Sequence, residues 1–179
     1  MLRAPRYSLL MGDAPRAAAI TIRPAGPDDA DGIARTFLES AEHHALLDGE
    51  RYWVPSAEAI SERYREGRQH PVESGAEAIT LVAEFRREIV GFVDARLHRS
   101  PDAMHRELTY CYVAEIAVGS RHQSHGVGAQ LLRAAEDWGR ALGAEFASLE
   151  YLASNTRAAA FYQQRMGYRA VSITAIKRL

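Results

Sequence analysis

A glycine-rich turn is the part of this sequence best suited to holding an anion. It reads Gln-Ser-His-Gly-Val-Gly over residues 123–128, between the apolar run 110–118 and the amphipathic helical pattern 126–142. The first N–H groups of a helix have no partner within the helix, and glycine lets a phosphate approach the backbone closely. The turn lacks the Gly-Lys-Ser/Thr ending of a Walker A loop and the third glycine of a dinucleotide fingerprint. The pattern therefore predicts either a phosphate-binding turn of another type or a plain tight turn.

A second block with a chemically useful pattern follows downstream. A strand-like run at 147–152 leads into Asn-Thr-Arg-Ala-Ala-Ala-Phe-Tyr at 155–162, and Gly-Tyr follows at 167–168. The two blocks resemble, in order and spacing, the signatures of the GCN5-related N-acetyltransferases, the GNAT superfamily. Those signatures are Gln/Arg-x-x-Gly-x-Gly/Ala for the acetyl-CoA pyrophosphate loop and Asn-x-x-Ala-x-x-Phe-Tyr followed by Gly-Phe/Tyr. The resemblance covers residues 79–179 well and residues 20–78 in general layout.

Hydrophobic periodicity and helix breakers indicate the elements that must position these blocks. Strands are expected at 20–23, 79–85, 88–97, 107–118, 145–152 and 169–179, with a hairpin turn at Arg86-Arg87. Helices are expected from Asp28 or Asp29 past Ala41, from Ser56 to before Pro71, at 126–142 and at 155–166. This βααβββαβαβ order predicts an α/β (α+β) fold with a mixed, mostly antiparallel central sheet of six or seven strands, flanked by about four helices. That arrangement is the GNAT layout.

The composition fits one domain and excludes partners that are bound through bulk charge. The chain has 179 residues, enough for a sizeable core, and a formal net charge of −1, so neither nucleic acid nor a membrane surface is an expected partner. We expect residues 1–19 to form a flexible leader and residues 20–179 to form a single acetyltransferase domain. Charges interrupt the apolar stretches, no secretory-signal pattern is present, and the single cysteine, Cys111, cannot form an internal disulfide. These features favour a cytoplasmic location.

The resemblance implies acetyl-CoA as the co-substrate. The N–H groups from Ser124 to Ala129 would hold its pyrophosphate, and Gln123 stands where the family often has arginine, so it keeps a donor but lacks the charge. In the family a bulge in the preceding strand leaves N–H groups for the pantetheine amide and the thioester carbonyl; a fully paired strand is the alternative. His125 either contacts phosphate or is a solvated turn residue, and Asn155 either contacts pantetheine or caps its helix. The residues assigned to the cofactor are Ile116, Ala117, Val118, Gln123, Ser124, His125, Gly126, Val127, Gly128, Ala129 and Asn155.

Acetyl transfer from a thioester to an amine also needs a base and an acid. The amine must lose a proton before it attacks, and the departing thiolate needs a proton donor. Tyr162 matches the family tyrosine that protonates the thiolate, although Phe161-Tyr162 would also suit packing against the sheet. Glu115 is the expected base, because burial in an apolar strand would raise its pKa toward neutrality. A salt-bridged or solvated Glu115 is the alternative, and Glu150 is the competing carboxylate.

The amine acceptor is expected to bind beside the first two helices, as in the family. Residues 42–55 concentrate histidine and aromatic side chains in a predicted loop, where they either shape a pocket or close the core. The residues assigned to the acceptor are His44, Tyr52, Trp53 and Glu150. A metal site at His43 and His44 is not expected, because adjacent helical residues point about 100° apart.

These assignments predict an N-acetyltransferase that moves an acetyl group from acetyl-CoA directly to a primary amine of a small molecule or a protein. Cys111 is not expected to act as a nucleophile, because it lies in a strand without an evident base. The alternative is a non-catalytic module that senses acyl-CoA, which would need the phosphate turn but neither Tyr162 nor Glu115. A phosphate-binding enzyme of another fold is disfavoured by the missing lysine. The last strand offers an edge through which two copies could pair as a homodimer.

Overall fold

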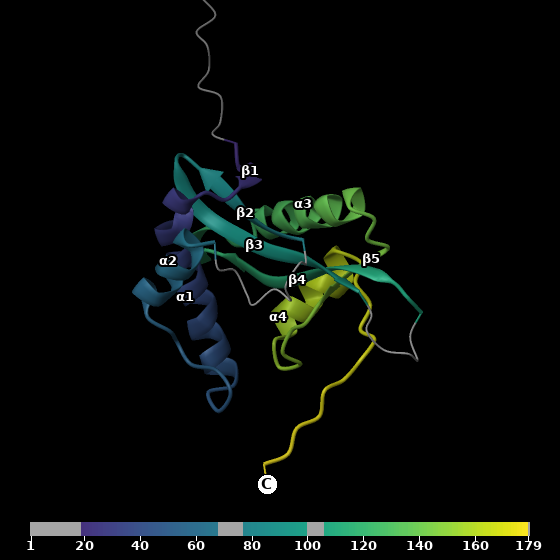
Figure 1. Cartoon of the computed structure of the whole chain (residues 1–179). Coiled ribbons are helices and arrows are strands. Elements are labelled where there is room, and N and C mark those ends of the chain that lie inside the picture. Colours follow the sequence, from purple (N-terminus) through teal and green to yellow (C-terminus); the bar gives the residue numbers. More distant parts are fainter. Residues whose placement is uncertain (1–18, 68–76, 100–105, 179) are drawn as a thin grey trace, which may run out of the picture.

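The computed structural model describes residues 19–67, 77–99 and 106–178, which form one sheet with helices on both faces (Figure 1). The sheet has five strands in the order β1-β2-β3-β4-β5. Their bounds are β1 Thr21–Pro24, β2 Ala78–Phe85, β3 Glu88–Arg99, β4 Thr109–Val118 and β5 Phe146–Leu149. Each of the first three strands pairs antiparallel with the next, and β5 pairs parallel with β4. The predicted mixed, mostly antiparallel α/β fold is therefore confirmed.

Helices α1 and α2 cover one face of the sheet, and α3 with the α4–η3 segment covers the other (Figure 1). The bounds are α1 Ala30–Leu47, α2 Ala57–Arg65, α3 Val127–Ala141 and α4 Thr156–Ala159, with 3-10 turns η1 Pro27–Asp29 and η2 Ser120–His122 and a π-helix, η3 Ala160–Arg165. The core beneath α3 is built around Leu131 and Leu132, whereas the core beneath α1 and α2 is built around Ile33 and Phe92. The sheet thus buries apolar side chains on both faces.

Local sequence signals explain where several elements begin and turn. The Ser56 hydroxyl accepts the N–H of the third residue after it at 3.2 Å, so it caps α2 as predicted. Arg86 and Arg87 have positive φ angles of 52° and 67°, as a two-residue type I′ hairpin turn between β2 and β3 requires. Asp29 directly precedes α1, but its carboxylate accepts hydrogen bonds of 2.7 and 2.8 Å from Arg23 and does not cap the helix.

Helix α1 is longer than its expected apolar positions, and α2 ends before Pro71, as expected. Helix α1 continues to Leu47, because neither glycine nor proline stands between Gly32 in its first turn and Gly49, and it therefore carries His43 and His44, which were expected in a loop. Helix α2 ends at Arg65. The stretch before Pro71, where that helix was expected to end, lies in part outside the described residues, as does the predicted leader apart from its last residue.

The predicted last strand at 169–179 is wrong. Residues 169–178 form no ladder with the described strands, so the sheet has five strands and not six or seven. Val171, Ile173 and Ile176 are 78, 96 and 67% exposed. A strand needs a neighbouring edge for its backbone hydrogen bonds, and this segment leads away from the sheet (Figure 1). The alternation of apolar and polar side chains is typical of a strand, but it does not provide the neighbouring strand to which the backbone would bond.

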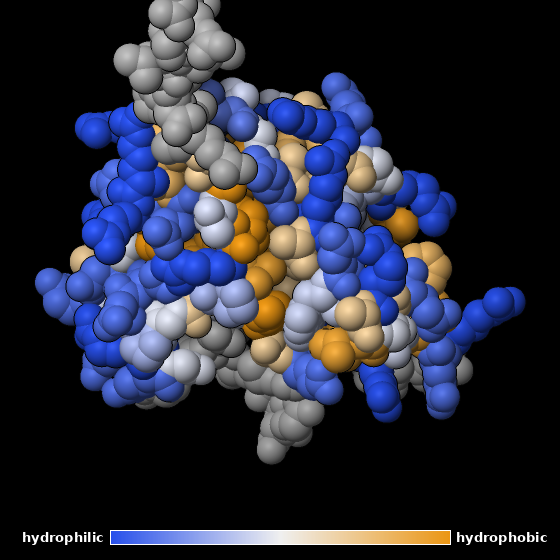
Figure 2. Space-filling model, turned by 90° about the horizontal axis from the view of Figure 1, so that it is seen from above, coloured by the Kyte–Doolittle hydropathy of each residue, from blue (hydrophilic) through white to orange (hydrophobic). Residues whose placement is uncertain are grey.

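The surface is mostly polar. Seen from above, hydrophilic residues cover most of the molecule, and hydrophobic residues form a narrower band between them (Figure 2). Among the described residues, none of the helices has the length and apolar character needed to cross a membrane. Outside the C-terminal segment, the exposed large hydrophobic residues are Leu46, Tyr52, Trp53, Val54, Leu142 and Phe146.

Helix α3 packs closely against β4 at Gly139, and this packing gives a testable prediction for Gly139→Ala. A methyl group at Gly139 would clash with the Cβ of Cys111, which is buried in β4. Alanine favours a helix over glycine by up to about 1 kcal/mol, but overpacking a core costs about 1–3 kcal/mol. We therefore expect the variant to lose about 1–2 kcal/mol of unfolding free energy in urea, whereas Arg133→Ala on the exposed side of α3 should lose less than about 0.5 kcal/mol. A Gly139→Ala variant as stable as the wild type would contradict this packing.

Candidate active site

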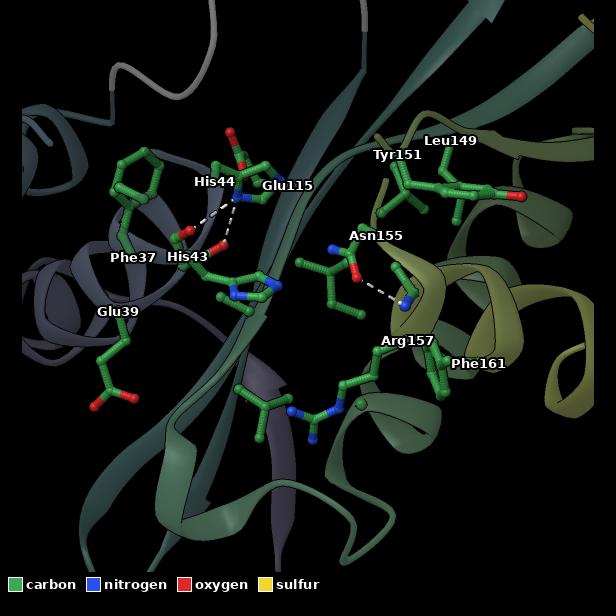
Figure 3. Close-up of a pocket in the computed structure, with 18 of the residues that line it drawn as sticks. Phe37, Glu39, His43, His44, Glu115, Leu149, Tyr151, Asn155, Arg157 and Phe161 are labelled. Atoms are coloured by element: carbon green, nitrogen blue, oxygen red, sulfur yellow. Dashed lines mark hydrogen bonds between the residues drawn. The ribbon is translucent and has the colours of Figure 1, made fainter. Parts of the chain in front are cut away.

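A groove of about 1400 Å³ runs between α1 and the α4–η3 segment, with the second half of β4 as its floor. In Figure 3 the α1 wall carries Phe37, Glu39, His43 and His44, and the opposite wall carries Asn155, Arg157 and Phe161. Small-ligand pockets usually measure about 300–1000 Å³. The groove is therefore large enough for one long ligand, or for two ligands placed end to end.

Strand β4 is exposed to the groove because it parts from β5. The two strands pair only as far as Val113 and Leu149, and within the described residues β4 continues to Val118 without a neighbour on that side. Against β3, the register shifts at Ala114, which has no counterpart there and forms a β-bulge. The expected splay over 116–118 thus lies within a longer open edge that begins at the bulge.

The open edge of β4 presents backbone N–H groups to the groove. Gly119 donates its N–H to the Val90 carbonyl at 2.9 Å, and residues that bond to an antiparallel neighbour alternate along a strand. The N–H of Ala117 therefore points toward β3, whereas those of Ile116 and Val118 point toward the open edge. Two donors in this arrangement suit an extended ligand with carbonyl acceptors.

The glycine-rich turn follows the open edge and leads into α3. Ser124 and Gly126 have positive φ angles of 65° and 84°, so the backbone curls before the helix begins at Val127. Gln130 donates the first helical hydrogen bond, to the Gly126 carbonyl, and no side chain caps the helix. The N–H groups of residues 127–129 are therefore available to an anion at the positive end of a helix dipole.

Side-chain hydrogen bonds hold this turn in place. Gln123 donates from Nε2 to the Val118 carbonyl at 2.9 Å, so this predicted phosphate ligand uses a donor to bind the strand edge. Glu39 on α1 accepts the Ser120 N–H at 2.6 Å and connects the turn to the opposite wall. His125 is exposed, and its Nδ1–H donates to the carbonyl of Gln123 at 2.7 Å.

Two arginines near the turn provide charge that the sequence pattern does not indicate. The Nη2 atom of Arg165 lies 3.9 Å from the position that a Cβ would take at Gly126. Arg157 lines the same end of the groove (Figure 3). Because Gln123 is neutral, these two side chains add positive charge that an anion at the turn would need. Their spacing in the predicted helix 155–166 gave no reason to single them out.

Tyr162 lies in η3 among aromatic neighbours and lines the groove. Its ring centroid is 5.4 Å from that of Tyr151 and 5.1 Å from that of Phe161, and 9% of the residue is exposed. Burial, and secondly the charge of Glu115, raise the pKa of Tyr162 to about 12, so the phenol is protonated throughout the neutral range. The segment is a π-helix, with a hydrogen bond from Met166 N–H to the Phe161 carbonyl, where an α-helix was expected; π turns often mark functional sites.

Glu115 lies on the floor of the groove beside a buried polar cluster. It is half-buried, and its register partner on β3 is Asp94, so both carboxylates are on the same face of the sheet. Asp94 is 4% exposed and accepts hydrogen bonds of 2.7 Å from the hydroxyls of Tyr64 and Thr80. Burial raises the pKa of Asp94 above its ordinary value, and the charge of Glu115 acts in the same direction. The cluster ties α2 to the sheet directly beneath the groove.

Arg63 on α2 is a groove residue for which the sequence holds no signal. Its Nη2 atom lies 4.0 Å from Oδ2 of Asp94, and its guanidinium lies over the rings of Phe37 and Tyr64 at 5.8 and 5.1 Å. Within the described part of the chain, its Nε and Nη2 atoms are buried and have no hydrogen-bond partner. Only the fold of α2 against the sheet brings this charge to the groove.

The residues assigned to the acceptor gather at the α1 end of the groove. The Nδ1–H of His44 donates to the Ser40 carbonyl at 2.8 Å, which leaves Nε2 as the acceptor nitrogen of the neutral ring. The ring of Tyr52 lies 5.3 Å from that of His44. Trp53 is 80% exposed, so it does not close the core. Glu150 lines the groove from the far side, directly after β5.

Most of the predicted site residues meet in this groove. Of the assigned residues only His125 and Val127 do not line it, and the Val127 side chain is buried in the core beneath α3. The carbonyl oxygen of the Asn155 side chain accepts the Ala158 N–H at 3.0 Å, so Asn155 caps α4 while it lines the groove.

The described residues contain no cluster of three or more histidine, cysteine, aspartate and glutamate side chains that could hold a metal ion. Cys111 is a buried free thiol whose Sγ lies 3.3 Å from the Ala135 carbonyl, to which it donates. Burial raises the pKa of Cys111 to about 11, so it is a protonated core residue at neutral pH.

Known structures share this fold at low sequence identity. A mutant of the BH1408 protein from Bacillus halodurans superimposes with a TM-score of 0.77 at 22% identity, over 89% of this chain and 99% of that one. The aminoglycoside N-acetyltransferase AAC(6')-Iy, solved in complex with CoA, superimposes with a TM-score of 0.67 at 17% identity, over 93% of this chain and 98% of that one. At these identities the likeness concerns the fold.

Sequence comparison identifies the family. The protein "Acetyl transferase GW6a" from Oryza sativa subsp. japonica is 30% identical in an alignment of 105 positions that covers 54% of this chain and 25% of that protein. The chain thus spans about a quarter of the length of this relative. The model of the acetyltransferase (GNAT) family matches residues 42–168, which hold the glycine turn, the open strand edge and Tyr162. The chain therefore belongs to the GNAT family of acetyltransferases.

Proposed function

We propose that the protein is an N-acetyltransferase that moves the acetyl group of acetyl-CoA directly to a primary amine. The observation that carries this proposal is one groove that is lined by the helix-start turn, the open edge of β4, Tyr162 and Glu115. Membership of the acetyltransferase family supports acetyl transfer, and the CoA complex of a structural relative supports acetyl-CoA as the donor.

The cofactor end of the groove offers both charge and directed donors. The N–H groups at the start of α3 would bind the pyrophosphate, with Arg157 and Arg165 adding positive charge. The N–H groups of Ile116 and Val118 would bind the carbonyl oxygens of the pantetheine arm and the thioester. The residues proposed for the cofactor remain Ile116, Ala117, Val118, Gln123, Ser124, His125, Gly126, Val127, Gly128, Ala129 and Asn155.

Tyr162 would act as the acid of the reaction. As the amine nitrogen bonds to the acetyl carbon, the carbon–sulfur bond breaks and the sulfur leaves with the electron pair. The buried phenol is protonated at neutral pH and would give its proton to that sulfur.

Glu115 would act as the base, directly or through a water molecule. A primary amine of pKa about 10.4 is mostly protonated at neutral pH and must lose a proton to attack. Glu115 lies on the groove floor between the cofactor end and the α1 wall, where His44, Tyr52 and Trp53 would shape the acceptor site together with Glu150 (Figure 3). An amine that enters from the α1 side would then approach the thioester beside this carboxylate.

Glu115→Gln is expected to lower kcat/KM roughly 100-fold at neutral pH, because the amide cannot take up the proton. Acetyl-CoA affinity should change little, since Glu115 lies beyond the phosphate turn. The matched control is Glu150→Gln, which removes the competing carboxylate of the same groove. If Glu150→Gln lost more activity than Glu115→Gln in the same pH series, the two assignments would have to be exchanged.

A thiol-release assay with a panel of amines tests the proposed function. Because AAC(6')-Iy is an aminoglycoside N-acetyltransferase, the panel should include aminoglycosides beside polyamines, lysine peptides and peptides with a free N-terminus. We expect amine-dependent release of CoA. Tight acetyl-CoA binding with no release for any amine would instead favour the alternative function, a non-catalytic acyl-CoA sensor, for which Tyr162→Phe would be without consequence.

A further inference from the structure

Lysine is almost absent from this sequence. Lysine and arginine together number 22, and Lys177 is the only lysine, so the other 21 are arginine. An acetyl group is transferred to an uncharged nitrogen, and the guanidinium of arginine stays protonated at any physiological pH. Lys177 therefore carries the one side-chain amine of this sequence that could accept an acetyl group.

Lys177 lies in an exposed segment whose end contacts the acceptor side of the groove. Residues 169–178 are all exposed, and none of them pairs with a described strand. Arg178, the neighbour of Lys177, forms an ion pair of 3.2 Å with Glu50 in the loop after α1. Two residues further along the same loop, Tyr52 lines the groove. Lys177 is thus held close to the loop that forms the acceptor end of the groove.

The other end of the segment is anchored through the residue proposed as the acid. Tyr168 donates its N–H to the Tyr162 carbonyl and its hydroxyl hydrogen to Glu136, each at 2.9 Å. The segment therefore runs from the end of η3 toward the loop after α1 (Figure 1). The nine residues 169–177 can span up to about 30 Å when extended. The chain is long enough to bring Lys177 to the groove while Tyr168 stays in place.

Little holds the segment in its present position. The side chains of Arg178 and Glu50 are 81 and 76% exposed, and surface ion pairs of this kind contribute little to stability. Because none of residues 169–178 is buried, moving the segment uncovers no core. A short flexible tether keeps its end at an effective concentration on the order of millimolar around its anchor. Lys177 is therefore a favoured acceptor compared with dilute amines.

We propose that the chain acetylates its own Lys177, within one copy. The proposal rests on the proposed function, because it uses the same groove and the same donor, acetyl-CoA. The Nζ atom of Lys177 would bond to the acetyl carbon as the carbon–sulfur bond breaks, which gives an amide and the thiol of CoA. The ammonium starts with three protons and the amide keeps one. Of the two that leave, one passes through Glu115 to solvent, and the other replaces the proton that Tyr162 gives to the sulfur.

Incubation of the full chain with acetyl-CoA and no added amine, followed by tryptic digestion and mass spectrometry, tests the proposal. Trypsin does not cleave after acetyl-lysine, so modification should replace peptide 170–177 by peptide 170–178. We expect the wild type to gain one acetyl group at Lys177, and Tyr162→Phe to gain it roughly 100-fold more slowly. Equal rates in both chains would indicate spontaneous reaction of an exposed amine with acetyl-CoA and would overturn the proposal.

A mixture of two variants distinguishes transfer within one copy from transfer between copies. Lys177→Arg keeps the charge and the groove but has no side-chain amine, whereas Tyr162→Phe keeps the lysine but lacks the acid. When equal amounts are mixed with acetyl-CoA, we expect Lys177 of the Tyr162→Phe chain to react no faster than it does alone. Faster acetylation would place the transfer between copies and contradict the proposal.

The amine panel separates this proposal from the proposed function. Lys177→Arg should acetylate added amines as fast as the wild type, because the substitution lies outside the groove. If the wild type acetylated added amines but left Lys177 unmodified, the self-acetylation would be overturned and the proposed function would stand. If neither the amines nor Lys177 gained an acetyl group, both proposals would fail together.

Discussion

Replacing Gly126 with glutamate is expected to weaken acetyl-CoA binding at least about 100-fold, or about 2.8 kcal/mol. Gly126 has a φ of 84°, a conformation that strains any residue with a Cβ by about 1–2 kcal/mol. A side chain there would also point toward Arg165, whose Nη2 lies 3.9 Å from the Cβ position, so the new carboxylate would neutralise a nearby cation. The same negative charge would stand before the N–H groups of 127–129 and repel phosphate.

The control for Gly126→Glu is Gly143→Glu. This variant introduces the same backbone strain at a position away from the groove. Gly143 follows α3 with a φ of 89° and has open space around its Cβ position, and it does not line the groove. Both variants should lose similar stability in urea, but only Gly126→Glu should lose acetyl-CoA binding in isothermal titration. Unchanged binding by a folded Gly126→Glu variant would rule out this turn as the phosphate site.

Tyr162→Phe is expected to lower kcat roughly 10²–10⁴-fold while acetyl-CoA affinity stays within about twofold. The substitution removes the proton donor but keeps the ring contacts with Tyr151 and Phe161. Because burial raises the pKa of Tyr162 to about 12, rising pH deprotonates the phenol only in strongly alkaline solution. The wild type should therefore show no loss of kcat from Tyr162 as pH rises to about 10, below that pKa.

Tyr168→Phe is the matched control for the loss of a hydrogen-bonded phenol hydroxyl outside the groove. Tyr168 donates a hydrogen bond of 2.9 Å to Glu136, and it does not line the groove. We expect this variant to lose stability but keep kcat. If the two variants lost the same fraction of turnover, or if Tyr162→Phe lost none, Tyr162 would be a packing residue and the proton donor would have to be another group.

The sequence predicts well the elements whose signals are local. The hairpin turn at Arg86-Arg87, the Ser56 cap and the order of the elements through the helix at 155–166 each depend on neighbouring residues, and the structure confirms them. The glycine turn is of the same kind, because its shape follows from positive φ angles at two adjacent positions of one short segment.

Features that arise from packing between distant segments could not be predicted in this way. The bulge at Ala114 depends on the register between β4 and β3, and nothing in an apolar run indicates which residue will lose its partner. Arg63 enters the groove only because α2 packs on the face that carries Asp94. The segment that holds Tyr162 was expected to be α-helical, but it forms the π-helix η3.

The segment 169–178 shows the limit of periodicity most clearly. Alternation from Val171 to Ala175 describes side chains suited to a strand, but a strand exists only where a second edge accepts its hydrogen bonds. Among the described strands, none pairs with the segment. The predicted last strand is therefore wrong.

The central claim is that this groove transfers an acetyl group from acetyl-CoA to an amine. Incubating the wild-type protein with acetyl-CoA labelled with carbon-13 in the acetyl group, together with the amine panel, and analysing the products by mass spectrometry tests the claim most directly. We predict labelled N-acetyl amine in an amount equal to the CoA released, and almost none with Tyr162→Phe. Bound acetyl-CoA with no label on any amine would contradict the account and would leave an acyl-CoA-binding module in its place.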